Sequence, residues 1–249
     1  MQLFAESVWV GWAPGPYACG MNPEALEIPL AINVAAVFVG ALGGAIRAGE
    51  DEHVDIIGVL TLATVMGFGG SLIRDVLLGN LPPAVLQSAW YVASVVIAAA
   101  IGAFFLYYLK KLGKVMWVLD SLSIGLFACV GVNAALLAGL TVLPAVLIGT
   151  LASIGGLILT DLFQGRPSSI LHAGPPNAAA GMAGSLAYAL LYTGDHAVVT
   201  AAVAIGITFA VRLSGPLLHV QVPRPRRRAY ELELKLRAKA AKRRGNSAN

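Results

Sequence analysis

The chain has 249 residues, of which 57% are hydrophobic and 12% are charged, and its mean hydropathy is +0.76. Soluble domains usually carry roughly 25% charged residues, so this composition argues against a soluble protein and favours an integral membrane protein. The formal net charge of +4 comes from one segment, because ten of the 17 basic residues lie between Arg224 and Arg244. The length allows about seven membrane-spanning helices, at roughly 20 residues each plus loops.

Residues 1–28 contain three acidic residues, no lysine or arginine, and several prolines and glycines. A secretory signal begins with basic residues followed by a clean apolar stretch, and this segment has neither. We expect a short N-terminal arm at the membrane surface, with Trp9 and Trp12 near the lipid headgroups.

Seven apolar segments follow the arm, and each is expected to form a helix, because an open strand cannot satisfy its backbone in lipid. Prolines near their starts and glycines near their ends support the boundaries. The predicted spans are 29–47, 55–78, 84–109, 115–139, 144–163, 175–193 and 196–214.

An internal repeat organises these helices. Gly69-Gly70 and Gly155-Gly156 lie in similar apolar runs, and each pair precedes an aspartate and a closing glycine at the same spacing. The repeat predicts two three-helix units, 29–109 and 115–193, with a seventh helix, 196–214, outside the duplication. Three helices per unit is an odd number, so the second unit must enter the membrane from the opposite face. This inverted repeat is a plan common among transporters.

The distribution of lysine and arginine predicts the orientation. If the N-terminus is outside, the inner loops and the inner end of the last helix hold six basic residues, Arg47, Lys110, Lys111, Lys114, Arg166 and Arg212. The positive-inside rule then predicts a multi-pass protein of the cell membrane, with residues 215–249 forming a basic cytoplasmic tail.

The four paired glycines allow two interpretations. A Gly-Gly pair can kink or unwind a helix and expose backbone groups to a water-filled cavity. Alternatively, small residues let membrane helices pack closely. The matching positions of the two pairs favour a pore element, so Gly69, Gly70, Gly155 and Gly156 are candidate pore or kink residues.

Several polar residues within the apolar segments are candidates for a pore or a gate. Arg74 and Asp75 follow the first pair, and Thr160 and Asp161 take the equivalent places after the second. If both aspartates face the centre, the site suits a cation or a zwitterion. The alternative is that these groups are solvated helix caps. Asp120 is a further candidate, although an acid near a helix start can simply complement the helix dipole.

The basic tail is expected to bind anionic lipid, at about 1 kcal/mol per basic residue near the surface. Its first cluster is Arg224, Arg226, Arg227 and Arg228. The alternative is that the tail only fixes topology, and nucleic-acid binding is disfavoured because the tail has one aromatic residue and is tethered to the bilayer. The cysteine and histidine spacings suggest neither a metal site nor a cofactor.

The segment from Gly69 to Gly79 and its second copy resemble the prokaryotic TRIC-type channels, a family also described as glycine-transporter-domain proteins. The resemblance covers about 30–214. It implies a homotrimer with one pore in each protomer, helices kinked at the glycine pairs, and permeation of monovalent cations, K⁺ above Na⁺. Thr160 departs from the pattern, since the first copy has an arginine at this place.

The leading hypothesis is therefore a K⁺ channel with a pore between the two repeats of each protomer. The alternative is a secondary transporter of a small zwitterion such as glycine, and a membrane scaffold is a third possibility. An enzyme is disfavoured because neither a nucleophile–base pair nor a metal cluster is evident in the sequence.

Overall fold

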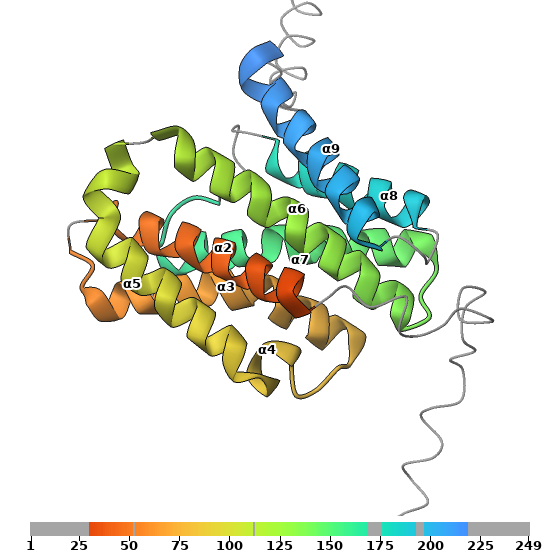
Figure 1. Ribbon diagram of the computed structural model, residues 1–249, viewed down its shortest axis with the longest axis horizontal. Coiled ribbons are helices and arrows are strands. Elements are labelled where there is room, and N and C mark those ends of the chain that lie inside the picture. The colour runs from red at the N-terminus through yellow and green to blue at the C-terminus, as the bar shows by residue number, and fades with distance from the viewer. Residues whose placement is uncertain (1–29, 52, 112, 169–175, 193–196, 219–249) are drawn as a thin grey trace, which may run out of the picture.

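Long apolar runs separated by glycine and proline fold into an all-helical bundle (Figure 1), seen in a computed structural model that describes residues 30–51, 53–111, 113–168, 176–192 and 197–218. The predicted N-terminal arm and the arginine cluster of the tail lie outside the described residues. The helices are α2 (Leu30–Ala48), α3 (Ile56–Leu78), α4 (Ala84–Gln87), α5 (Ala89–Lys111), α6 (Gly113–Leu137), α7 (Val142–Phe163), α8 (Asn177–Leu191) and α9 (Ala197–Leu218).

Five segments within the described residues are long and apolar enough to cross a membrane. They are Leu30–Ala48, Ile56–Leu78, Trp117–Leu137, Val142–Phe163 and Ala197–Ser214. A shorter apolar stretch, Ala89–Phe105, lies in α5, and α8 has 15 residues. Large apolar side chains also cover the outside of the bundle, as contact with lipid requires. The protein is thus an all-α, multi-pass membrane protein.

Local sequence signals account for several helix ends. The Asp55 side chain caps the start of α3 by accepting a hydrogen bond of 2.7 Å from the Gly58 amide. The predicted terminators Gly79, Gly139 and Gly165 have φ angles of 71°, 81° and 62°, a left-handed conformation that glycine adopts at little cost. The sequence therefore placed the ends of α3, α6 and α7 correctly.

Other predicted boundaries were wrong. The span predicted at 84–109 is divided, because the backbone is extended at Ser88 and separates the four-residue α4 from α5. Helix α7 begins at Val142, with Pro144 inside its first turn, where the missing amide of proline is not needed. By contrast, the span predicted at 196–214 agrees with the apolar segment Ala197–Ser214, and helix α9 continues beyond it to Leu218.

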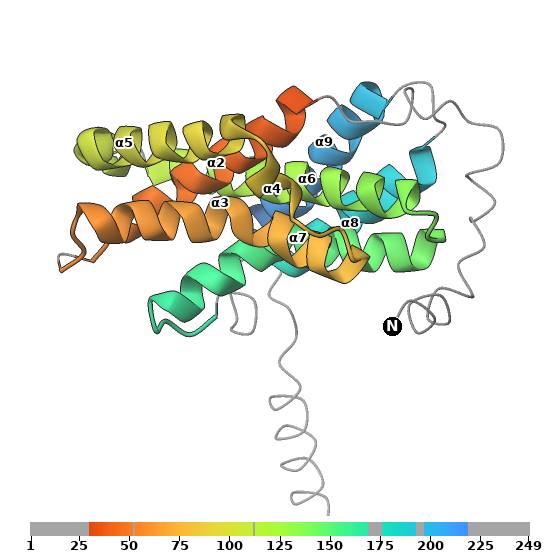
Figure 2. The same ribbon diagram turned by 90° about the horizontal axis from the view of Figure 1, so that it is seen from below.

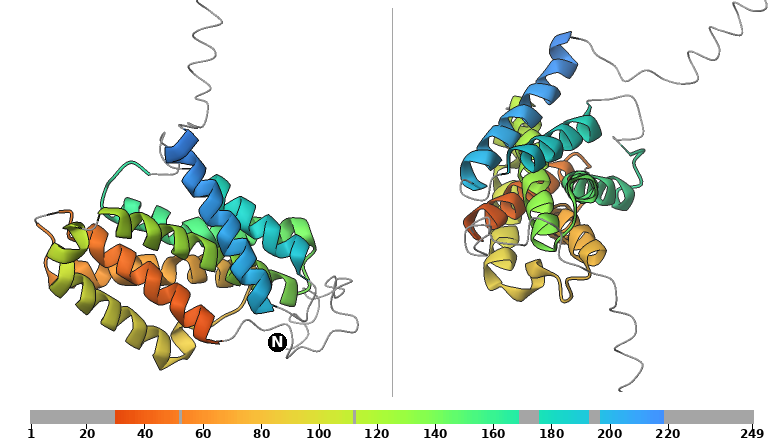
Figure 3. Two further views of the ribbon diagram at one scale, coloured as in Figure 1. Left: turned by 45° about the horizontal axis from the view of Figure 1, so that its top comes forward. Right: turned by 90° about the vertical axis from the view of Figure 1, so that its right-hand side faces the viewer.

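The helices pack around two apolar clusters. One lies between α2, α3 and α5 and includes Phe127 of α6, and the other lies between α6, α7, α8 and α9. Figure 2 shows α5, α2 and α3 on one side, α8 and α9 on the other, and α6 and α7 between them. Helix α9 crosses α8 and α6 obliquely (Figure 3). Helices α6 and α7 therefore contact both sides of the bundle.

Candidate functional site

The two glycine pairs meet where α3 crosses α7. A Cβ added at Gly69 would lie 2.9 Å from the Gly156 Cα, and one at Gly70 would collide with the Ala152 carbonyl oxygen. A Cβ at Gly156 would collide with the Met66 carbonyl oxygen in the same way. Glycine at these positions is what allows the two backbones to touch.

Both helices remain α-helical through their glycine pairs. The unwound turn expected at Gly69-Gly70 and Gly155-Gly156 is therefore not present in α3 or α7. The pairs instead form a close helix–helix contact, which is the second of the two interpretations offered by the sequence. A bend at the pairs that keeps the helix intact, and any pore role for these glycines, stay predictions.

The α3–α7 contact is antiparallel, since Met66 lies by Gly156 and the later Gly70 lies by the earlier Ala152. Asp75 and Asp161 follow their glycine pairs in opposite directions. They are separated by roughly 20 Å along the crossing, at 1.5 Å per residue. The two carboxylates do not share one central site, and each belongs to a different end of the bundle.

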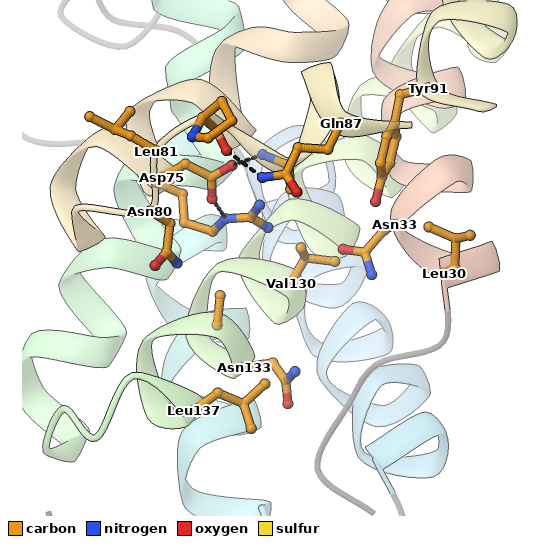
Figure 4. Close-up of a pocket in the computed structure, with 14 residues that line it drawn as sticks. Leu30, Asn33, Asp75, Asn80, Leu81, Gln87, Tyr91, Val130, Asn133 and Leu137 are labelled. Atoms are coloured by element: carbon orange, nitrogen blue, oxygen red, sulfur yellow. Dashed lines mark hydrogen bonds and ion pairs between the residues drawn. The ribbon is translucent and has the colours of Figure 1, made fainter. Parts of the chain in front are cut away.

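A cavity of about 590 Å³ opens at the first of these ends (Figure 4). Within it, Arg74 Nε donates a 2.7 Å hydrogen bond to Asp75 Oδ1, and Asp75 Oδ2 accepts a 2.8 Å bond from the Ala84 amide. Arg74 is 6% exposed and Asp75 2%. The predicted pair is therefore a buried, hydrogen-bonded ion pair rather than a solvated cap. We call this space the Asp75 cavity.

Uncharged polar side chains complete the lining of the Asp75 cavity. Its amide and phenol groups come from α2, the α3–α4 loop, α4, α5 and α6, namely Asn33, Asn80, Gln87, Tyr91 and Asn133. Asn133 Oδ1 accepts a 3.1 Å hydrogen bond from the buried Tyr188 hydroxyl. Apart from the Arg74–Asp75 pair, the polar groups of this cavity are uncharged.

Four charged side chains gather at the opposite end. Arg47 Nη2 donates a 2.6 Å hydrogen bond to Asp120 Oδ2 and Arg47 Nη1 lies 3.9 Å from Asp161 Oδ1. Arg212 Nη2 lies 3.9 Å from the same Asp120 oxygen. We call Arg47, Asp120, Asp161 and Arg212 the four-charge cluster. Its formal charges sum to zero.

The four-charge cluster is incompletely hydrogen-bonded. Among the described residues, five of its buried atoms or those beside it have no hydrogen-bond partner, namely Arg47 Nε, Asp120 Oδ1, Gln164 Oε1, Arg212 Nε and Arg212 Nη1. Arg212 is 2% exposed, and its guanidinium carbon lies 5.7 Å from the centre of the Trp117 ring. Buried polar atoms without a hydrogen-bond partner usually mark a strained contact or the place of a water molecule or ion.

Sequence reasoning assigned Arg47 and Arg212 only to the inner side and missed their role as partners of Asp120. Arg47 lies one residue before the end of α2, and Arg212 is six residues before the end of α9. Arg212 lies inside a predicted apolar span, and this is a signal that could have been used, because charges within membrane spans are rare unless they are paired.

Thr160 takes the place in the second motif that Arg74 has in the first. It is fully buried and donates a 2.8 Å hydrogen bond from Oγ1 to the Gly156 carbonyl oxygen within α7. The hydroxyl is thus used inside its own helix. Arg47, from a different helix, supplies the positive charge beside Asp161 instead.

One face of α6 connects the two ends. Asp120, Ser123 and Phe127 line a void of about 10 Å³ between α3, α6 and α7. Val130 and Asn133, the next residues on that face, line the Asp75 cavity. Successive members are three or four residues apart, which keeps them on one helical face.

Phe127 lines the void, and along the α6 face it lies between the residues of the void and those of the Asp75 cavity. Its side chain is 3% exposed, and a Cβ at Gly40 would lie 3.1 Å from its Cε2. A Cβ at Gly70 would lie 3.3 Å from Cδ1 of the same ring. The aromatic ring therefore packs against α2 and α3 at the level of the glycine crossing.

The family model described as "Glycine transporter" matches residues 30–108 and 117–193. The chain belongs to this family. A UPF0126 membrane protein of Deinococcus radiodurans is 31% identical over 141 residues, which cover 57% of this chain and 65% of that protein. The chain thus spans just under two thirds of that relative's length.

Solved structures of TRIC cation channels share the fold. One of them, from work on the structural basis for conductance through TRIC cation channels, matches this chain with a TM-score of 0.69 and 25% sequence identity. The match covers 80% of this chain and 97% of the channel's chain. The TRIC trimeric intracellular cation channel orthologue from Rhodobacter sphaeroides also has a TM-score of 0.69 and 25% identity, with 77% and 98% covered. The family resemblance carried by the Gly-Gly motifs is confirmed.

Proposed function

We propose that the protein is a K⁺ channel whose pore runs through each protomer along the α6 face from the Asp75 cavity to the four-charge cluster. The observation that carries this proposal is the continuity of that face, since Asp120, Phe127 and Asn133 lie on one side of one helix and line two separate spaces. In this proposal the Phe127 ring is the closed point of the path, which is supported by its burial and its place on the α6 face.

The chemistry of the proposed path suits a monovalent cation. Amide oxygens in the Asp75 cavity can replace part of the hydration shell of an ion, as polar groups do in other channels. The buried charges along the path are balanced by pairing, so no large net charge of either sign builds up in the described residues. A small residual attraction lets an ion enter and leave again.

The architecture that goes with this proposal has seven spans and an inverted repeat. Its support is the match of one family model to two segments and the antiparallel contact of α3 with α7. The excess of lysine and arginine on one side supports a cytoplasmic C-terminus. The trimeric cation channel of R. sphaeroides supports a homotrimer, and the tail arginines would contact anionic lipid.

A second candidate is a transporter of a small zwitterion such as glycine. The Asp75 cavity favours it, because about 590 Å³ lies within the usual volume range of small-molecule sites. Its amides could bind an ammonium group while Arg74 faces a carboxylate.

Reconstitution into liposomes separates the two functions. A channel is expected to pass K⁺ down an imposed gradient without added ionophore, and to show single-channel currents in a planar bilayer. A transporter is expected to accumulate labelled glycine with saturable kinetics and without such currents. Saturable glycine uptake in the absence of single-channel currents would reject the channel.

The location of the pore is tested with two phenylalanine variants. Phe127→Ala removes the ring between the two spaces and is expected to raise K⁺ flux several-fold. Phe104→Ala is the matched control, because this side chain is 82% exposed on the outside of the bundle. Equal flux from both variants would place the pore away from the α6 face.

A further inference from the structure

We propose that Asp120 Oδ1 is a binding position for a partly dehydrated monovalent cation, and that Arg47 and Arg212 hold this site weak so that the ion leaves quickly. The inference rests on the proposed channel function and names the place where a permeating ion pauses.

Asp120 presents its two oxygens to different surroundings. Oδ2 accepts the 2.6 Å hydrogen bond from Arg47 and has Arg212 at 3.9 Å. Oδ1 is buried, has no hydrogen-bond partner among the described residues, and belongs to a residue that lines the void on the α6 face. The whole residue is 7% exposed. A buried carboxylate oxygen without a donor is an acceptor that still lacks a positive partner.

The void that Asp120 lines has further oxygen atoms in its wall. Ser123 and Ser153 line it together with Met66 and Gly156. Met66 and Gly156 belong to the close contact of α3 with α7, so the serine hydroxyls and Asp120 are the side-chain oxygens that this void offers. Oxygen ligands of this kind suit K⁺ or Na⁺, and about 10 Å³ is close to the space that one water molecule needs. A single ion without most of its water has a similar size.

The neighbouring charges determine how tightly an ion is held. The attraction of the Asp120 carboxylate is opposed by the guanidinium groups of Arg47 and Arg212, whose closest approaches are to Oδ2. The negative charge of Asp161 balances the second guanidinium group. Because Coulomb energy falls with distance, an ion at the buried, unpaired Oδ1 is attracted by that oxygen although the cluster as a whole has no net charge. Removal of either arginine would leave a net charge of −1 and a tighter site.

The experiment measures single-channel conductance against K⁺ concentration for the full chain in planar bilayers. Arg212→Gln is expected to lower the half-saturating K⁺ concentration by more than about tenfold, the effect of removing one charge at about 7 Å across an effective dielectric constant of about 20. It should also lower the maximal conductance, and Ba²⁺ should block it at lower concentration. Ser123→Ala, which leaves every charge in place, should raise the half-saturating concentration.

Arg212→Lys is the matched control, because it keeps the charge and removes the guanidinium contacts. A half-saturating concentration near the wild-type value for Arg212→Lys, together with the shift for Arg212→Gln, supports the electrostatic role. Equal shifts in the two variants, or unchanged values in both Arg212→Gln and Ser123→Ala, would overturn the inference. A wild-type protein that carries no K⁺ current would instead reject the channel function.

Discussion

Replacing Gly156 with alanine is expected to destabilise the protein, whereas the same change at its neighbour Gly155 is expected to be tolerated. The two glycines have the same helix propensity and differ in what a new Cβ would meet. At Gly156 it meets the Met66 carbonyl oxygen, which belongs to the backbone, and at Gly155 it meets Ile73 Cδ1, the end of a flexible side chain. A backbone atom can yield only if α3 and α7 separate.

The size of the effect follows from this overlap. An ordinary C···O contact is about 3.3–3.6 Å, and the added Cβ lies well inside that distance, so α3 and α7 would have to separate by roughly 1 Å. Overpacking of this kind costs about 1–3 kcal/mol. For a protein of this size the cost corresponds to a fall of roughly 2–12 °C in Tm, at about 2–4 °C per kcal/mol. Alanine is also favoured over glycine in a helix by about 0.5–1 kcal/mol, which partly offsets the cost.

Thermal unfolding of the purified protein in detergent, followed by circular dichroism, measures this difference. Gly206→Ala serves as the reference, because Gly206 lies in α9 with no described atom within 4 Å of the added Cβ. Gly156→Ala should melt well below both Gly155→Ala and Gly206→Ala. If the three variants melt together, backbone contact at the crossing is not what requires a glycine there.

Three other changes probe the remaining contacts. Asp75→Ala leaves a buried arginine without its partner and should cost about 3–5 kcal/mol, measured by thermal unfolding, with Asp75→Asn losing less because it keeps an acceptor. Tyr188→Phe removes the hydrogen bond to Asn133 and should cost about 1–2 kcal/mol in the same measurement. Glu50→Gln breaks the exposed 2.5 Å ion pair with Arg166 and should change stability by less than about 1 kcal/mol; a larger loss would show that this pair is not a simple surface contact.

The sequence predicted the membrane class, the family and most helix positions, because apolar length, terminal glycines and the paired motif are local signals. It did not predict the break at Ser88. An apolar run is equally compatible with one helix or two, and the extended backbone at Ser88 is not a composition signal.

The sequence singled out the buried aspartates but not the ion pairs that they form. Asp75, Asp120 and Asp161 were all identified, yet their partners are set by tertiary contacts. Arg47 pairs with Asp120 across 73 positions of the chain. The motif spacing also suggested one central site, whereas an antiparallel crossing places Asp75 and Asp161 at opposite ends. Spacing along a chain does not report which way two helices run past each other.

The two mouths of the proposed pore differ in chemistry, because the Asp75 cavity holds one arginine–aspartate pair among amide groups, whereas the opposite end holds two arginines and two aspartates, one of the arginines from α9. An ion therefore passes one guanidinium group at one end of the proposed path and two at the other. The energy profile along such a path is not symmetrical. Equal and opposite voltages should therefore drive unequal currents, so the channel is expected to rectify.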